Sequence, residues 1–194
     1  MKKIDMAYLE KLEPKSIQAA LAMMAFNPSI GRTLPKRSVD KFLNSVLREM
    51  PKLKKVRTRN EFDHFHDRWC IKLRKEIGRR CGYGSAQKAI NVFLKMFVYW
   101  SKVPGNSKKL IPLLHVPLDS VVMGHLNEYH WPEVEKLVEP YYQNCEHDYY
   151  NLKYMTREQY LAWQKLLRKI AGKHPPIRID VIWQLDRLKR ADRS

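Results

Sequence analysis

A chain of 194 residues, 44% of them apolar, is long enough to bury one hydrophobic core, and we expect a single domain over residues 1–194. Lysines and arginines number 37 against 20 aspartates and glutamates, so the formal net charge is +17 and a nucleic acid is the expected partner. No apolar run reaches the length of a membrane span, and three cysteines do not make a disulfide framework. These properties exclude a membrane protein and a disulfide-stabilised secreted domain, and we expect a cytoplasmic, nucleoid-associated monomer.

Three segments in the first half of the chain carry apolar residues at helical spacing, and strand alternation is nearly absent throughout. They are residues 9–27, residues 38–50 and residues 60–77. Ser38 is the expected N-cap of the second segment, and Pro51 is its expected stop. The pattern predicts three helices.

The middle of the chain joins a Gly-rich turn to a helix that we expect to start at Ser85 and to keep an apolar face through Trp100. Residues 102–112 contain two prolines, one glycine and three lysines, which predicts a loop. Asp119 then opens the next helix.

Three further helices are predicted towards the C-terminus, and the first of them starts at Trp131 and Pro132. Thr156 and Gln159 form a capping-box pattern at the start of the next, which ends at Gly172. The third spans residues 180–190. The predicted fold class is therefore all-α.

Lys88 and Asp119 are the candidate catalytic residues. The partial positive charge of a helix N-terminus favours the neutral form of a first-turn lysine, and a neutral amine can attack a sugar carbon and form a Schiff base. The same charge stabilises the carboxylate of Asp119, which can in turn stabilise positive charge on a sugar ring. On spacing and charge alone, an exposed helical lysine and an ordinary N-cap are the simpler explanation of both residues.

The order of these motifs resembles the helix-hairpin-helix DNA glycosylase superfamily. In that family a Gly-rich hairpin leads into the helix that bears a nucleophilic lysine, and a Val/Pro-Val-Asp segment places the catalytic aspartate at the next helix start. Residues 84–94 resemble the hairpin and lysine helix, and residues 116–122 resemble the aspartate segment. The resemblance covers residues 82–126 and implies two helical lobes around a DNA-binding cleft, with Lys88 as nucleophile and Asp119 as essential carboxylate.

Three features depart from the family pattern. Ala86 stands where the hairpin usually has its second glycine. The interval from Lys88 to Asp119 is longer than in most members and is similar to the archaeal 8-oxoguanine branch. Three scattered cysteines cannot build the four-cysteine iron–sulfur cluster of some members, so we expect neither a cofactor nor a metal. The resemblance implies excision of 8-oxoguanine, or of a hypermodified base of phage DNA as an anti-phage defence, with a lyase step if Lys88 forms the Schiff base.

The other predicted site residues fall into two sets. Basic side chains and backbone amides expected to bind DNA phosphates are Lys54, Lys55, Arg57, Lys108, Lys109, Gly82, Gly84 and Ser85. Aromatic and polar side chains expected to contact the flipped base are Tyr83, Gln87, Asn91, His66, Trp69 and His115. For each member of the second set, a structural role in the core is the alternative.

Three rival interpretations remain open. Arg59 and His64 have the R-x4-H spacing of the HEPN ribonucleases, which cleave RNA with these residue types. His66 and Cys70 lie one helical turn apart, as metal ligands do, although such a pair is more often structural. The non-enzymatic alternative is a basic DNA-binding protein without catalytic activity.

Overall fold

The computed structural model describes residues 34–35, 38–78, 81–100, 106–142 and 151–181. These residues form helices and no strand, which confirms the all-α class for the described part of the chain. The elements are α4 Val39–Leu53, α5 Arg59–Ile77, α6 Tyr83–Leu94, η1 Lys95–Trp100, α7 Ser107–Leu110, η2 Ile111–Leu113, α8 Ser120–Tyr129, α9 Trp131–Leu137, η3 Glu139–Tyr141, α10 Arg157–Ala171 and η4 Pro176–Val181. The helix predicted over residues 9–27 lies outside the described residues, as does most of the one predicted over 180–190.

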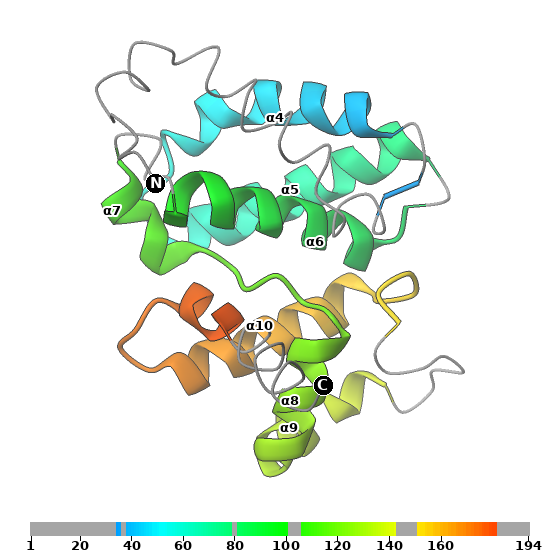
Figure 1. The fold of residues 1–194 in the computed structure, drawn as a ribbon, viewed down its shortest axis with the longest axis vertical. Coiled ribbons are helices and arrows are strands. Elements are labelled where there is room, and N and C mark those ends of the chain that lie inside the picture. The colour runs from blue at the N-terminus through cyan, green and yellow to red at the C-terminus, as the bar shows by residue number, and fades with distance from the viewer. Residues whose placement is uncertain (1–33, 36–37, 79–80, 101–105, 143–150, 182–194) are drawn as a thin grey trace, which may run out of the picture.

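The helices form two groups, one above the other in Figure 1. The upper group contains α4, α5, α6 and α7, and the lower group contains α8, α9, α10 and η4. α5 packs against both α4 and α6, while α10 packs against α6, α9 and η4. The segment from η2 to α8 runs between the groups. Lys88 lies on α6 in the upper group, and Asp119 lies at the start of α8 in the lower group. No helix in the described ranges is long and apolar enough to cross a membrane.

One cluster of buried apolar side chains holds the described helices together. Its largest fully buried members include Phe42, Phe62 and Trp69 in the upper group and Tyr160 and Trp163 in the lower one. Each such side chain stabilises the fold by about 2 kcal/mol relative to an exposed one.

The ends of α5 and α10 follow from local sequence. Thr58 and Glu61 form a capping box at the start of α5, and Thr156 and Gln159 form the predicted one at the start of α10. Each box satisfies backbone N–H groups that have no partner within the helix. The predicted stop of α10 at Gly172 is confirmed, with this residue at φ 58°.

Two details of α4 differ from the prediction. Ser38 makes no side-chain capping hydrogen bond, and Pro51 lies inside the helix, which continues to Leu53. A proline removes one backbone hydrogen bond, but the last turn still packs because Leu53 is fully buried and Met50 nearly so.

The start of α6 also differs from the prediction. The helix begins at Tyr83 rather than Ser85, which places Lys88 in its second turn. Because the helix-end charge falls off within the first turn, it acts less on Lys88 than the sequence suggested. Helical structure continues beyond α6 as the π-helix η1, and residues 107–112 of the predicted loop lie in α7 and η2.

The two glycines before Lys88 allow a close approach between backbones. A Cβ on Gly82 would lie 2.1 Å from the Lys153 carbonyl oxygen, and one on Gly84 would lie 2.3 Å from that of Leu152. Only glycine fits at such distances, so the Gly-rich turn docks the start of α6 onto the segment that precedes α10.

We expect Gly84→Ala to destabilise the protein by about 2 kcal/mol, because the new methyl group overlaps backbone atoms and the 2.9 Å-distant Cβ of Met155. Gly124→Ala in α8 is the matched control, since nothing lies within 4 Å of its added Cβ. There the better helix former should stabilise the protein by up to about 1 kcal/mol. Urea denaturation of both variants measures the difference, and equal stabilities would contradict the close docking.

Candidate functional site

Lys88 and Asp119 lie together although 30 residues separate them along the chain. Lys88 Nζ is 3.6 Å from Asp119 Oδ2. The other carboxylate oxygen, Oδ1, accepts a hydrogen bond of 3.0 Å from the Val122 backbone N–H, which makes Asp119 the N-cap of α8 as predicted. One oxygen therefore fixes the side chain while the other faces the amine.

Both side chains of this pair remain within reach of solvent. The Lys88 side chain is 17% exposed and that of Asp119 is 26% exposed. An amine and a carboxylate held this close can act on one atom of a ligand, the amine as nucleophile and the carboxylate as a stabiliser of positive charge. An ion pair between two helices is the simpler function of the same geometry.

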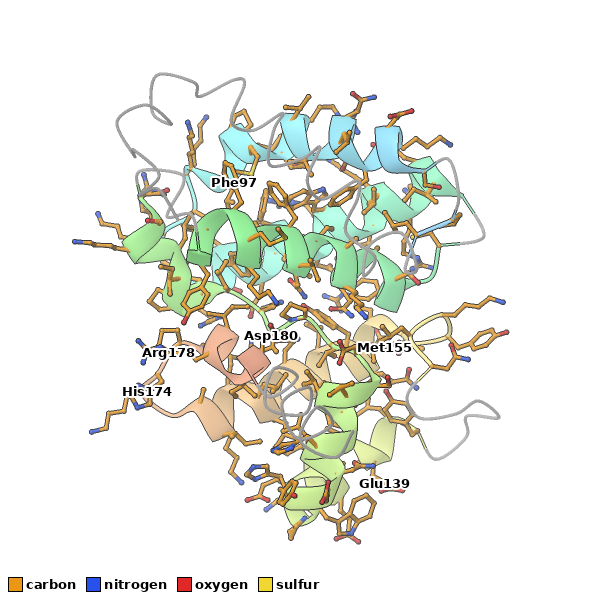
Figure 2. The ribbon with its side chains drawn as sticks, in the orientation of Figure 1. Phe97, Glu139, Met155, His174, Arg178 and Asp180 are labelled. Carbon is orange, nitrogen blue, oxygen red and sulfur yellow. The ribbon has the colours of Figure 1, made fainter. Side chains whose placement is uncertain are left out.

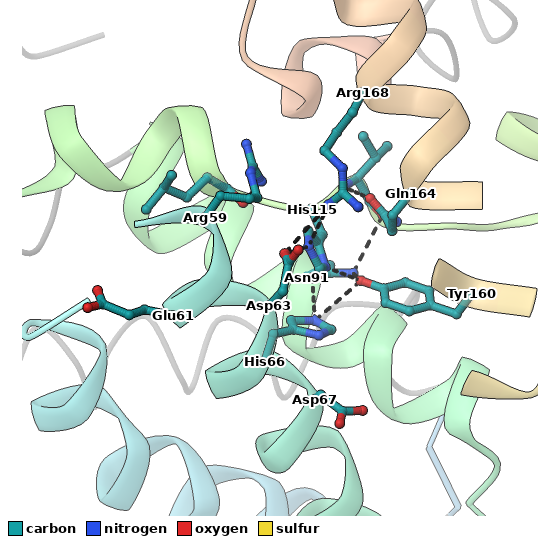
Figure 3. A network of polar contacts seen from close by, with 12 residues as sticks. Arg59, Glu61, Asp63, His66, Asp67, Asn91, His115, Tyr160, Gln164 and Arg168 are labelled. Carbon is teal, nitrogen blue, oxygen red and sulfur yellow. Dashed lines mark hydrogen bonds and ion pairs between the residues drawn. The ribbon is translucent and has the colours of Figure 1, made fainter. Parts of the chain in front are cut away.

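A buried polar network joins the two helix groups beside this pair (Figure 3). His115 Nε2 donates to Asp63 Oδ1 at 2.7 Å, and His115 Nδ1 accepts from the Tyr160 hydroxyl at 2.6 Å. The Tyr160 oxygen in turn accepts from Asn91 Nδ2 at 3.0 Å. Because one ring nitrogen donates and the other accepts, the pattern fits a neutral His115.

Asn91 is the centre of this network. His66 Nε2 donates to its carbonyl oxygen at 2.8 Å, and its amide donates to Gln87 Oε1 at 2.9 Å. The Cys70 thiol lies 3.6 Å from the remaining ring nitrogen of His66, which completes a pattern that fits a neutral imidazole. α6 thus presents Asn91 and Gln87 to the interior and, one turn before Asn91, Lys88 to the junction between the helix groups.

The segment that leads to Asp119 is fixed by a side-chain amide. Gln164 Nε2 donates to the Val116 carbonyl oxygen at 2.8 Å, and Gln164 Oε1 accepts from the Val116 N–H at 3.1 Å. The side-chain amide thus binds both the N–H and the C=O group of Val116, as a neighbouring strand would. These bonds hold the backbone three residues before Asp119. α10 therefore sets the position of the carboxylate relative to Lys88.

Burial and charge shift the pKa values in the network. Burial holds the pKa of His66 well below its ordinary value, and a proton on the neighbouring His115 would lower it further. Burial also lowers the pKa of His115, although Asp63 opposes it. For Asp63, burial alone would raise the pKa, but the hydrogen bond from His115 and the nearby arginines together lower it. Asp63 is therefore held as a carboxylate beside two neutral histidines.

All six residues predicted to contact a flipped base are buried. His66, Gln87, Asn91 and His115 belong to the network described above. Tyr83 donates to Asp67 Oδ1 at 2.9 Å, and Trp69 Nε1 donates to the Ser45 hydroxyl at 2.9 Å. Because their polar groups are satisfied inside the protein, the structural alternative holds for these side chains.

The basic residues predicted to bind phosphate are exposed; they are Lys54, Lys55, Arg57, Lys108 and Lys109. The Asn106 amide donates to the Lys54 carbonyl oxygen at 3.1 Å, so the connection between α4 and α5 lies beside the start of α7. A pocket of about 510 Å³ opens next to this connection, lined by Lys52, Lys55, Val56, Asn60, Glu61, His64, Phe65 and Arg68. One end of the upper group therefore has a surface suited to a polyanion.

The Gly-rich turn is placed differently from these lysines. Gly84 and Ser85 are buried, and the backbone of residues 152–153 covers the turn at Gly82. This packing covers part of the turn, and the predicted contact of its amides with a DNA phosphate stays a prediction.

Among the described residues, Arg59 and His64 line different pockets, and His66 and Cys70 have no third metal ligand beside them. Arg59 and His64 lie five residues apart on α5, a turn of roughly 140° around the helix. Arg59 also donates to the carbonyl oxygens of Pro112 and Leu113. His66 and Cys70 do touch, but the described residues contain no group of three or more potential metal ligands.

Sequence reasoning missed Asp63, Tyr160, Gln164 and Arg168, which complete the network. Tyr160, Gln164 and Arg168 are spaced four residues apart on α10. This spacing places them on one face of the helix, where they form a polar stripe that the sequence alone reveals. Nothing in the sequence states that this stripe is covered by α5 and α6.

No protein-family model, curated protein or solved structure matches the chain.

Proposed function

We propose that the protein is a DNA glycosylase that removes a modified base, with Lys88 as nucleophile and Asp119 as stabiliser of the cationic sugar. The observation that carries the proposal is the 3.6 Å approach of two partly exposed groups from separate helices. The sequence resemblance to helix-hairpin-helix glycosylases assigns chemistry to the same two residues.

The partner in this proposal is DNA, bound by a monomer in the cytoplasm and nucleoid. The net charge of +17 and the exposed lysines beside α7 support the binding of DNA. In this proposal the two helix groups of Figure 1 act as the two lobes, and DNA binds at their junction beside Lys88 and Asp119.

The reaction uses each group once. As the bond between the base and C1′ breaks, its electron pair leaves with the base, and the Asp119 carboxylate stabilises the positive charge on the sugar. The Lys88 amine then forms a bond to C1′, and the proton that its nitrogen loses goes to the departing base. The bond between C1′ and the ring oxygen breaks, the ring oxygen takes the second proton of the nitrogen, and a Schiff base results. Loss of a C2′ proton together with the 3′ phosphate is the lyase step.

The direct test is to trap the Schiff base with borohydride on duplex DNA that carries the modified base. The wild type should form a covalent protein–DNA complex, and Lys88→Gln should form none, because glutamine has no nucleophilic amine. Lys165→Gln is the matched control, since this lysine is exposed on α10. A complex that forms equally in Lys88→Gln would remove the nucleophile assignment.

The excised base is either 8-oxoguanine or a hypermodified base of phage DNA. The long interval between Lys88 and Asp119 favours the former by its similarity to the archaeal branch. Mass spectrometry of bases released from DNAs with different modifications distinguishes the two. If no base is released from any of them while DNA binding persists, the protein is a non-catalytic DNA-binding module.

A further inference from the structure

We propose that the pocket between the start of α5 and the end of α10 binds a phosphate group. Its lining residues come from three segments and are Arg59, Pro112, Arg168, Gly172, Lys173, His174, Pro175 and Pro176. The volume of about 280 Å³ lies at the small end for ligand sites, which suits a phosphate better than a whole nucleotide. Neither Lys88 nor Asp119 lines this pocket.

Positive charge dominates the lining. Arg59, Arg168 and Lys173 all contribute to it, and no carboxylate does. Arg168 Nη1 lies 3.5 Å from Asp63 Oδ1, but that oxygen already accepts from His115 at 2.7 Å. The lining therefore holds three cations and no carboxylate, with Asp63 close to Arg168, and an anion would supply the missing charge.

Arg59 is held in place without being neutralised. Its guanidinium donates to the carbonyl oxygens of Pro112 and Leu113, which fixes its orientation but carries no formal charge. Burial lowers the pKa of Arg59, and the positive charge of Arg168 lowers it further, although Asp63 acts in the opposite direction. Two like charges held at one pocket are costly unless an anion lies between them.

Guanidinium groups also give the site its selectivity. A guanidinium donates two parallel hydrogen bonds to phosphate oxygens, so an arginine pair can contact several oxygens of one phosphate. Lys173 and His174 are exposed at the rim and can turn towards the ligand (Figure 2 labels His174). The partial charges of the two helix ends largely cancel in the pocket, since the start of α5 favours an anion and the end of α10 disfavours one. The side chains therefore decide the charge of the pocket.

The test measures binding to the full chain by titration calorimetry at low chloride, with inorganic phosphate and thymidine 5′-monophosphate as probes and thymidine as the phosphate-free control. Arg168→Gln should weaken phosphate binding at least about ten-fold. Lys173→Gln, at an exposed position, should weaken it about three-fold without affecting folding. Arg178→Gln is the matched control, because this exposed arginine on η4 does not line the pocket and its loss should change affinity by less than about two-fold.

A pair of DNA duplexes tests whether the bound phosphate is a strand end or part of the DNA backbone. Tighter binding of a duplex with a 5′-phosphate than of the same duplex with a 5′-hydroxyl indicates a strand end, whereas equal binding with competition by inorganic phosphate indicates a backbone phosphate. Absence of phosphate binding by the wild type, or wild-type affinity in both Arg168→Gln and Lys173→Gln, would overturn the proposal. These measurements involve no base excision, so their outcome is independent of the proposed glycosylase activity.

Discussion

Replacing Asp119 with asparagine is expected to slow base release at least about 100-fold, because the amide has the shape of the carboxylate but no charge to stabilise a cationic sugar. DNA binding should persist, since Asp119 contributes no positive charge to it. Single-turnover assays on duplex DNA with the modified base measure release, and a band-shift titration measures binding.

The same variant is expected to fold normally. Asparagine is as good an N-cap as aspartate, so its side-chain oxygen can keep the bond to the Val122 N–H. Asp119→Ala should instead cost about 1 kcal/mol of unfolding free energy through the lost cap. Asp40→Asn, at an exposed position of α4, is the control for general charge effects. Full excision by Asp119→Asn would contradict the assigned role.

The sequence predicted those parts of the structure that depend on neighbouring residues. The capping box at Thr156, the stop at Gly172 and the N-cap at Asp119 each involve atoms within a few positions of one another. The approach of Lys88 to Asp119 is the exception, because it was inferred from a resemblance and not from local spacing.

The predicted base pocket shows what local reasoning cannot supply. Polar residues near the motif, such as Asn91 and His115, were assigned to a ligand because polarity and proximity in sequence are visible. Both side chains in fact bind the hydroxyl of Tyr160 on α10, which lies 69 residues from Asn91 along the chain. Whether a polar side chain faces water or another helix is decided by tertiary packing alone.

The network and the candidate pair belong to one arrangement. Asn91 lies one turn after Lys88 on α6, and Val116 lies three residues before Asp119. Gln164 binds the Val116 backbone, while Asn91 and Gln164 both approach the same Val116 carbonyl oxygen, at 3.5 Å and 2.8 Å. The interior hydrogen bonds therefore set the distance between two groups at the junction, and a change in the network should reach the pair.

Acid is expected to destabilise the protein through this network. His66 and His115 are held neutral in the folded state with lowered pKa values, mainly by burial, whereas the unfolded chain protonates histidine near its ordinary value of about 6.5. The unfolded state thus binds more protons as the pH falls from 7 to 5, and the free energy of unfolding decreases by about 2 kcal/mol for each histidine that stays neutral. Below pH 5, the lowered pKa of Asp63 acts in the same direction, because its stabilisation is lost on protonation.

Urea denaturation at several pH values measures this loss, and histidine variants locate its source. His66→Gln should flatten the pH dependence, whatever its effect on stability at pH 7, because the buried group no longer titrates. His115→Asn should flatten it less, because Asp63 partly opposes the lowering of the His115 pKa. His64→Gln is the matched control, since His64 is exposed on the same helix as His66 and should leave the slope unchanged. An unchanged slope in His66→Gln would show that the acid sensitivity arises elsewhere, and excision activity that fell with the same pH profile would tie the network to the position of Lys88 and Asp119.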